Sequence, residues 1–263
     1  MSQLNNTDKP LVIAQFSDSH LFADTKGLHH GSNVYQHLQQ VLADIAARKN
    51  IDIIVFTGDL SQDHSEQSYQ HFAKAVQQVK LAVPVFFIAG NHDEPASLTK
   101  HLTEPVFCPA TTVNTKAWQI QLLDSKSATP AGFVSKEALA KLATDIDKNK
   151  FQLLMMHHHP IDVGYFIDRH GLTNQAEFWQ GIDDMQQAKI NVQAIACGHV
   201  HRAIFLPKQT SQSRQSVDVY TCPATSIAFD PTKATVSSLN LGPSYRLFYL
   251  HCNGAIDSEI VCL

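Results

Sequence analysis

Polar residues of the types that bind metal ions recur in five short clusters, each directly after an apolar run. The clusters are Asp18-Ser19-His20, Gly58-Asp59, Gly90-Asn91-His92-Asp93, His157-His158-His159-Pro160 and Gly198-His199-Val200-His201. Carboxylate and amide oxygens combined with imidazole nitrogens suit iron, manganese or zinc. The clusters contain no cysteine, which argues against a structural zinc site.

Each cluster alone has an ordinary explanation, because Asp, Asn and Gly are common turn residues and a histidine at a strand end is usually solvated. Five in succession, all at the expected carboxyl ends of strands, favour one convergent site, since open α/β sheets bind ligands at that edge. The chain also has 15 histidines, several in apolar stretches. A polar ring in such a stretch needs a partner or a metal.

The elements that position these clusters follow from the apolar periodicity. Runs at 11–17, 51–57 and 83–89 predict buried strands, and the segments 34–48 and 66–80 have helical spacing, so the first half is expected to be βαβαβ. Further strands are expected at 118–123, 151–156, 192–197, 217–221, 245–250 and 255–261.

Only one strong helix, at 135–149, separates the later strands, so the parallel pattern is expected to give way to a mixed or second sheet. This predicts an α/β fold in the form of a layered sandwich, with 1–263 as a single domain. Loops are expected at 161–174 and 207–216. The first of these directly follows a histidine cluster, which makes it the better candidate for contacting a substrate.

Composition excludes several classes of protein. The net charge is -4 and no run of Lys or Arg occurs, which disfavours a nucleic-acid partner. The longest apolar run, at 81–89, is too short to cross a bilayer, and the opening segment MSQLNNTDKP has no signal-peptide character, so a cytoplasmic protein without a membrane partner is expected. The five cysteines are odd in number and show no CxxC spacing, as expected for reduced thiols.

The motifs DxH, GD, GNHD, HHP and GHxH, in this order between Asp18 and His201, resemble the signature of calcineurin-like metallophosphoesterases. The longer stretches SDSHLFAD, TGDLSQDHSEQSYQHF, HHHP and CGHVHR resemble bacterial class III cyclic-AMP phosphodiesterases. The resemblance implies an αββα sandwich of two mixed sheets that hydrolyses 3',5'-cyclic AMP to 5'-AMP. It also implies two divalent metal ions, with iron and manganese preferred and zinc a further candidate.

The same resemblance assigns the metal ligands. One ion would be held by Asp18, His20, Asp59 and His201, and the other by Asp59, Asn91, His158 and His199, so that Asp59 bridges the pair. His158 is assigned because it stands two positions before Pro160. Strand alternation puts His157 and His159 on the opposite face, where they are expected to support or pack, with His159 as the alternative ligand.

The chemistry of such a site follows from the charges. Two divalent ions outweigh the charges of Asp18 and Asp59, which attracts a phosphodiester anion. In two-metal sites a bridging water becomes hydroxide near neutral pH and attacks phosphorus. The resemblance places His92 at the phosphate, where it stabilises the transition state or protonates the leaving alkoxide. The expected contacts to substrate are His20, Asp59, Asn91, His92 and His201.

Other readings stay open at this point. Asp93 either orients His92 or closes a turn, and Asp63 stands where protein phosphatases of the superfamily have Arg, which weakens a phosphoprotein substrate. Turn or loop chemistry explains Asp168, His170, Asn174 and the segment 223–226 better than nucleotide contact does. The rival functions are a related phosphoesterase with another substrate and an inactive scaffold, and the complete ligand set argues against the scaffold.

Overall fold

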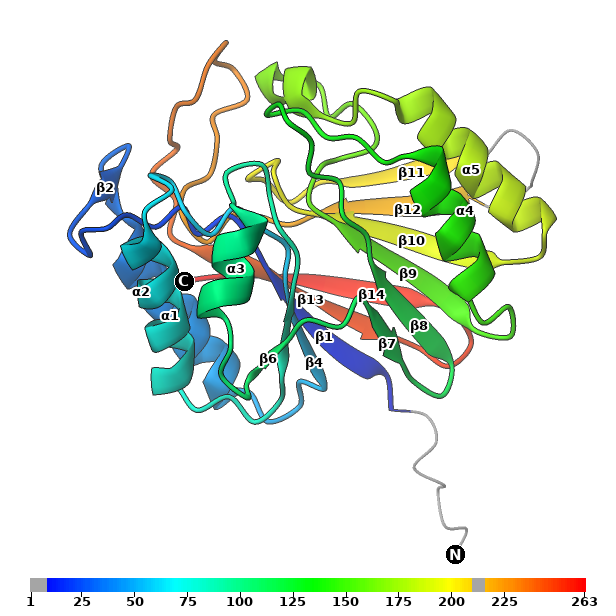
Figure 1. The fold of residues 1–263 in the computed structure, drawn as a ribbon, viewed down its shortest axis with the longest axis horizontal. Helices are drawn as coiled ribbons and strands as arrows, with labels where there is room; N and C mark the ends of the chain where they lie inside the picture. Colours follow the sequence, from blue (N-terminus) through cyan, green and yellow to red (C-terminus); the bar gives the residue numbers. More distant parts are fainter. Residues whose placement is uncertain (1–8, 210–215) are drawn as a thin grey trace, which may run out of the picture.

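Two six-stranded sheets stack face to face in the computed structural model, which describes residues 9–209 and 216–263 (Figure 1). The first sheet has the order β14-β13-β1-β4-β5-β6. Its strands are β1 (Leu11–Phe16), β4 (Ile53–Phe56), β5 (Val85–Phe87), β6 (Phe107–Cys108), β13 (Ser244–Leu250) and β14 (Ile256–Cys262). The strands β1, β4, β5 and β6 pair parallel, whereas β13 pairs antiparallel with both β1 and β14, so the sheet is mixed.

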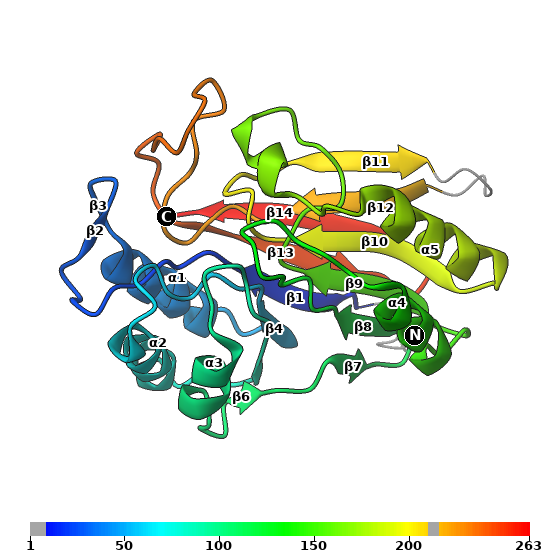
Figure 2. The same ribbon diagram turned by 45° about the horizontal axis from the view of Figure 1, so that its top comes forward.

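The second sheet has the order β11-β12-β10-β9-β8-β7 and is also mixed, because its two edge strands pair antiparallel with their neighbours (Figure 2). Its strands are β7 (Thr112–Asn114), β8 (Trp118–Leu122), β9 (Phe151–Met156), β10 (Asn191–Cys197), β11 (Phe205–Gln209) and β12 (Ser216–Thr221). A short hairpin of β2 (Leu28–His29) and β3 (Ser32–Asn33) stands apart from both sheets. The predicted α/β sandwich of two mixed sheets is therefore confirmed.

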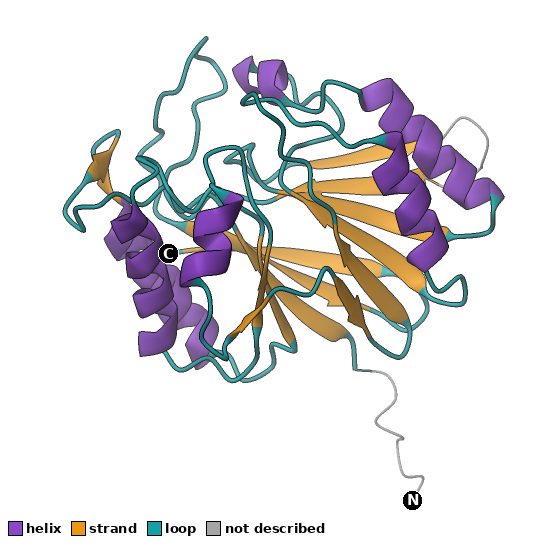
Figure 3. Ribbon diagram, in the orientation of Figure 1, coloured by secondary structure: helices purple, strands orange, loops and turns teal. Residues whose placement is uncertain are grey.

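Helices cover the outer face of each sheet (Figure 3). Those on the first sheet are α1 (Val34–Ala47), α2 (Glu66–Gln78) and α3 (Pro95–His101), and those on the second are α4 (Lys136–Asp145) and α5 (Gln175–Gln187). The side chains of Asn33, Ser65 and Ser135 cap α1, α2 and α4, each accepting a hydrogen bond from the backbone N–H three residues later. No helix in the described residues combines the length and apolar character needed to cross a bilayer.

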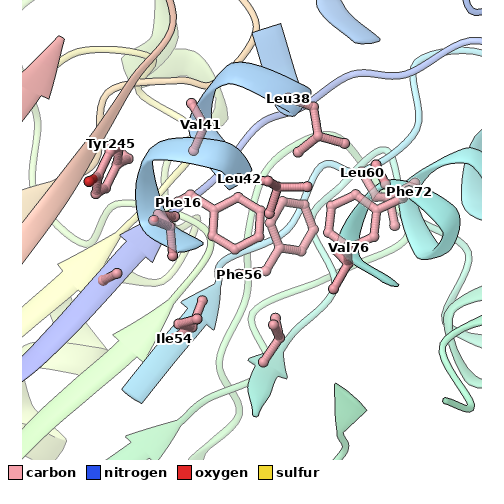
Figure 4. Close-up of a cluster of buried hydrophobic side chains, with 14 of the residues drawn as sticks. Phe16, Leu38, Val41, Leu42, Ile54, Phe56, Leu60, Phe72, Val76 and Tyr245 are labelled. Atoms are coloured by element: carbon pink, nitrogen blue, oxygen red, sulfur yellow. The ribbon is translucent and has the colours of Figure 1, made fainter. Parts of the chain in front are cut away.

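Strand alternation fills two kinds of core. In β4, Phe56 points toward the helices and Val55 points into the space between the sheets, so the strand is apolar on both faces. Figure 4 shows the helix-side cluster, in which the ring centroids of Phe56 lie 5.0 Å from Phe16 and 4.7 Å from Phe72. These contacts fix β1 and β4, whose carboxyl ends carry two of the polar clusters.

Three expectations about the second half need correction. A second strong helix, α5, follows the predicted loop, because Phe178, Ile182 and Met185 form an apolar stripe in an otherwise polar segment. The helix expected at 135–149 ends at Asp145. Of the loop expected at 207–216, residues 207–209 belong to β11 and Ser216 begins β12, while 210–215 lie outside the described residues. The loop at 161–174 is confirmed, with a short 3-10 helix, η1 (Phe166–His170).

Candidate metal centre

Five of the predicted ligands lie where the carboxyl ends of β1, β4 and β10 meet, on a backbone in an unusual conformation, while Asn91 and His158 follow β5 and β9. Asp18, His20, Asp59, His199 and His201 all have φ between 46° and 66°, in the left-handed region. They are five of the ten non-glycine residues with positive φ in the described chain. Because such backbone is strained for these residue types, its concentration here indicates that the surrounding structure holds the side chains in place for function.

Two glycines allow the loops to approach one another. Gly58 has φ +95°, and a Cβ atom there would lie 2.4 Å from the backbone nitrogen of Gly90. A Cβ atom on Gly198 would lie 2.2 Å from the hydroxyl oxygen of Ser17. Side chains at either position would push the polar clusters apart.

A first group of donors consists of Asp18, His20 and His201, whose ligand-type atoms all lie within 4.8 Å of one another. The Nε2 atom of His201 is 3.4 Å from Oδ1 of Asp18 and 3.1 Å from Nε2 of His20. All three side chains are buried. Ring nitrogens this close repel unless a proton or a metal ion lies between them.

The carboxylate of Asp59 stands between this group and a second one. Its Oδ1 atom accepts a hydrogen bond of 2.8 Å from the backbone N–H of His92. Its Oδ2 atom lies 3.6 Å from Nε2 of His20 and 3.4 Å from Nε2 of His157. Burial is the largest single influence and raises the pKa of this carboxyl. The charge and hydrogen bond of His157, together with the charges of His20 and His92, outweigh burial and hold the pKa well below its usual range.

The second group forms around His157. Its Nε2 atom lies 3.1 Å from Oδ1 of Asn91, besides its approach to Asp59. Burial is the largest single influence and lowers the pKa of His157. The charge and hydrogen bond of Asp59, together with Asp18 and the carbonyl oxygen of Thr57, outweigh burial and raise the pKa to about 9. Nearby, Nε2 of His199 is buried and has no hydrogen-bond partner in the described structure. Two oxygens and an orphaned ring nitrogen around one imidazole form a site that a cation fits.

His158, the histidine assigned from the sequence, is engaged elsewhere. Its Nδ1 atom lies 2.9 Å from the hydroxyl of Ser125, and its Nε2 atom donates to the carbonyl oxygen of Pro130 at 3.2 Å. Both ring nitrogens therefore have protein partners, although the ring remains close to His157 and His199. The geometry favours His157 over His158 as the ligand from this cluster.

Three of the inward-facing histidines share one pattern of support. The Nδ1 atoms of His157 and His201 lie 2.7 Å and 2.8 Å from the backbone oxygens of Thr57 and Ile227. In the same way, Nδ1 of His20 lies 2.7 Å from the side-chain oxygen of Gln62. Histidines that bind metals usually donate their other ring N–H to such an acceptor, which fixes the ring and turns Nε2 inward. The residues present therefore fit a metal centre.

His92 lies beside the donors. Burial lowers its pKa, and its Nδ1 atom is buried without a hydrogen-bond partner in the described structure. Its ring is 5.0 Å from that of His20, edge-on, and 5.9 Å from that of His64, nearly parallel. Its side chain lines the same cleft as His20 and Asp59, so it is placed to meet a molecule bound there.

Asp93 closes the turn after β5. Its Oδ2 atom accepts from the backbone N–H of Gly90 at 2.8 Å, and its Oδ1 atom accepts from that of Leu60 at 2.9 Å. Of the two roles left open by the sequence, the structure shows the turn role. The bonds to Leu60 and Gly90 join the loops after β4 and β5, which hold Asp59 and Asn91.

A cleft of about 270 Å³ opens beside the donors. Sequence reasoning missed most of its outer wall, which consists of Pro130, Phe166, Ile167, Arg169, His170, Phe229, Thr235 and Val236. Of the loop candidates named from the sequence, His170 lines the cleft. Asp168 instead accepts backbone hydrogen bonds from Val163 and Gly164 within its own loop. The one sequence signal for Phe166 and Phe229 is that each is an aromatic residue in a segment without strand or helix periodicity.

Other candidates support the loops. The side chain of Asn174 bonds the backbone of Val134. The backbone N–H groups of Thr225 and Ser226 donate to the carbonyl oxygens of Ser17 and Asp18 at 2.9 Å and 3.1 Å. The segment 223–226 therefore supports the backbone of the loop that carries Asp18.

A sandwich of two mixed sheets, with buried Asp and His side chains and a half-buried Asn gathered at the carboxyl ends of its strands, is the architecture of a metal-dependent hydrolase. Residues 11–203 match the calcineurin-like phosphoesterase family, and the chain belongs to this family. The chain is 52% identical over 257 residues to a probable cyclic nucleotide phosphodiesterase of Colwellia psychrerythraea. The alignment covers 97% of this chain and 96% of that protein.

A more distant relative agrees with this assignment, and a solved structure shares the fold. The chain is 31% identical over 260 residues to the 3',5'-cyclic adenosine monophosphate phosphodiesterase CpdA of Vibrio vulnificus, covering 97% of this chain and 90% of that one. Purple acid phosphatase PPD1 of yellow lupin has the same fold, with a TM-score of 0.59 at 15% identity over 96% of this chain. This chain spans about half the length of the solved structures it matches, 53% in that case.

Proposed function

We propose that this protein hydrolyses 3',5'-cyclic AMP to 5'-AMP at a pair of divalent metal ions. The observation that carries the proposal is the position of Asp59, whose Oδ2 atom faces His20 on one side and His157 on the other. A carboxylate between two groups of nitrogen and oxygen donors suits two cations that share one ligand. The relatives from Colwellia and Vibrio, named as cyclic nucleotide phosphodiesterases, supply the substrate class.

The proposed ligands divide into two sets that share Asp59. Asp18, His20 and His201 complete the first set, and Asn91, His157 and His199 complete the second. His157 replaces His158 because its Nε2 atom faces oxygens of Asp59 and Asn91, two other proposed ligands, whereas the nitrogens of His158 face Ser125 and Pro130. Iron and manganese are the preferred ions by family resemblance, and the donor types also suit zinc.

When bound, two such ions supply Lewis-acid activation of the phosphoryl group and of the attacking water. The chain's own residues orient the reaction. The backbone N–H of His92 fixes the Asp59 carboxylate. The His92 imidazole lines the cleft, and its proposed role is a hydrogen bond to the phosphate and to the departing ribose 3'-oxygen. His20, Asn91 and His201 also line or border the cleft and are proposed to approach the phosphate.

A substrate panel with varied metals tests the proposal. Purified protein loaded with manganese, iron or zinc is assayed on cyclic AMP, cyclic GMP, 2',3'-cyclic AMP and bis(p-nitrophenyl) phosphate. We expect cyclic AMP to be cleaved to 5'-AMP with about two metal ions per chain. Negligible cleavage of cyclic AMP with rapid cleavage of another ester would reassign the substrate within the family. A metal content near zero under every loading condition would instead indicate an inactive scaffold.

A further inference from the structure

The cleft beside the proposed metal centre has two ends of different chemistry. One end is formed by the donors His20, Asp59, Asn91 and His199. The other end is largely apolar, with Pro130, Phe166, Ile167, Phe229 and Val236 among its lining residues. A phosphate would contact only the first end, so any further part of a bound ligand would lie against the apolar second end.

A stacked pair of rings, His201 and Phe229, links the apolar end of the cleft to the donors. The ring of His201 lies on that of Phe229 with centroids 3.8 Å apart and planes 8° from parallel. Phe229 is 5% exposed, and the second aromatic ring against it is that of Phe166, with centroids 5.3 Å apart and planes tilted by 47°. Because Phe166 is only half-buried, it presents ring surface to the cleft. A group attached to a phosphate at His201 would meet Phe166 next.

Arg169 holds this wall together. Its Nε atom donates to the backbone oxygen of Phe166 at 3.0 Å, and its Nη2 atom donates to the backbone oxygen of Ala234 at 2.6 Å. Its guanidinium carbon lies 5.9 Å from the centroid of the Phe166 ring. Figures 1 and 2 both show η1 and the loop at 230–243 standing side by side above the sheets. Through its hydrogen bonds to these two carbonyl oxygens, Arg169 links the two segments.

We propose that Phe166, Phe229 and Val236 form the subsite for the base of a nucleoside 3',5'-cyclic monophosphate. This inference rests on the proposed function and names the part of the substrate that the outer wall recognises. The phosphate lies at the metal end, and the planar base lies against Phe166. Aromatic side chains bind bases by stacking, which tolerates any base because every base has a π-face.

The polar groups at this end are few, which makes stacking the main interaction. Arg169, His170 and Thr235 are the lining residues here with polar side chains. Arg169 is engaged with backbone oxygens, and Thr235 is exposed at the rim. The subsite is therefore suited to the face of a base more than to reading its edge.

The test compares cyclic AMP with a base-free analogue in which hydrogen replaces adenine at C1'. We expect Phe166→Leu to lower kcat/KM for cyclic AMP by about tenfold, through KM, and to leave the base-free ester unchanged. Phe166→Trp should keep or improve activity on cyclic AMP. Phe151→Leu is the matched control, because Phe151 is also half-buried beside an aromatic residue, Trp118, but lies at the opposite end of β9.

The outcomes separate this proposal from the proposed function. An equal loss on both substrates in Phe166→Leu, or no loss on either, would overturn the base subsite while wild-type cleavage of cyclic AMP upholds the function. A wild-type protein that cleaves the base-free ester as well as it cleaves cyclic AMP would overturn the subsite alone. Cleavage of other esters but of neither cyclic phosphate would overturn both proposals.

Discussion

The Nε2 atom of His157 lies 3.4 Å from Oδ2 of Asp59, although His157 follows a strand of the second sheet and Asp59 follows a strand of the first. The same ring is held by the backbone oxygen of Thr57, 100 residues earlier in the chain. The contact with Thr57 orients the ring so that its other nitrogen, Nε2, faces the carboxylate that we propose to bridge two ions.

His157→Ala should therefore remove one of two metal ions, whereas His158→Ala should retain both. We expect cyclic AMP hydrolysis to fall by more than about 100-fold in His157→Ala, because losing a ligand costs at least as much as losing its supporting bond. Loss of the bonds from His158 to Ser125 and Pro130 should lower stability by about 1–3 kcal/mol. Metal stoichiometry measured by mass spectrometry distinguishes the two. The reverse result, with His158→Ala losing the metal, would restore the sequence-based assignment.

Strand alternation explains why the histidine cluster was hard to resolve from sequence. The rule says that neighbours in 157–159 face different sides, and it does not say which side meets Asp59. That depends on how the two sheets stack, which is fixed by a buried cluster whose members, Ile13 and Ile120 among them, lie far apart in the chain. Strands such as 151–156 could be predicted because both of their faces are apolar.

The outer wall of the cleft could not be predicted for a different reason. Phe166 and Phe229 lie outside the strands and long helices, in segments where no periodicity predicts the direction of a side chain. Their rings contact each other, and a hydrogen bond from Arg169 to Ala234 links the two segments. Helix α5 was missed because its three apolar positions are diluted by glutamine and aspartate. Local pattern thus predicted most of the longer strands and helices and the segments that carry the candidate donors, whereas long-range packing decides how the side chains meet.

Removal of metal should destabilise the fold. The carboxylates of Asp18 and Asp59 are at most 2% exposed, so without cations their charges are balanced only by nearby histidines. An ion present at about 100 times its Kd stabilises the folded state by about 2.7 kcal/mol, so a chelator should lower the Tm by several degrees. Manganese should restore it. Asp59→Asn is the control: its Tm should respond little to either treatment, and a shift equal to wild type would contradict a site at Asp59.

Replacement of Arg169 should affect substrate binding more than turnover. Arg169→Met keeps the apolar stem but removes the bonds to Phe166 and Ala234, so the two segments of the outer wall lose their link. We expect KM for cyclic AMP to rise by about tenfold, the size of a lost charge-assisted hydrogen bond, with kcat within about twofold of wild type. Steady-state kinetics separate the two constants. A fall in kcat at unchanged KM would argue against a positioning role for Arg169.

His92→Ala should slow the cleavage of poor leaving groups more than that of good ones. The imidazole lines the cleft beside His20, and its proposed role is to donate to the departing oxygen. A ribose alkoxide needs that proton, whereas p-nitrophenolate leaves without it, so we expect a loss of about 100-fold to 10,000-fold on cyclic AMP and a much smaller one on bis(p-nitrophenyl) phosphate. His64→Ala is the matched control, since His64 stacks beside His92 but is exposed. Equal losses on both substrates, with full metal content, would limit the His92 side chain to a role in binding the phosphate, because the backbone N–H that holds Asp59 is kept in this variant.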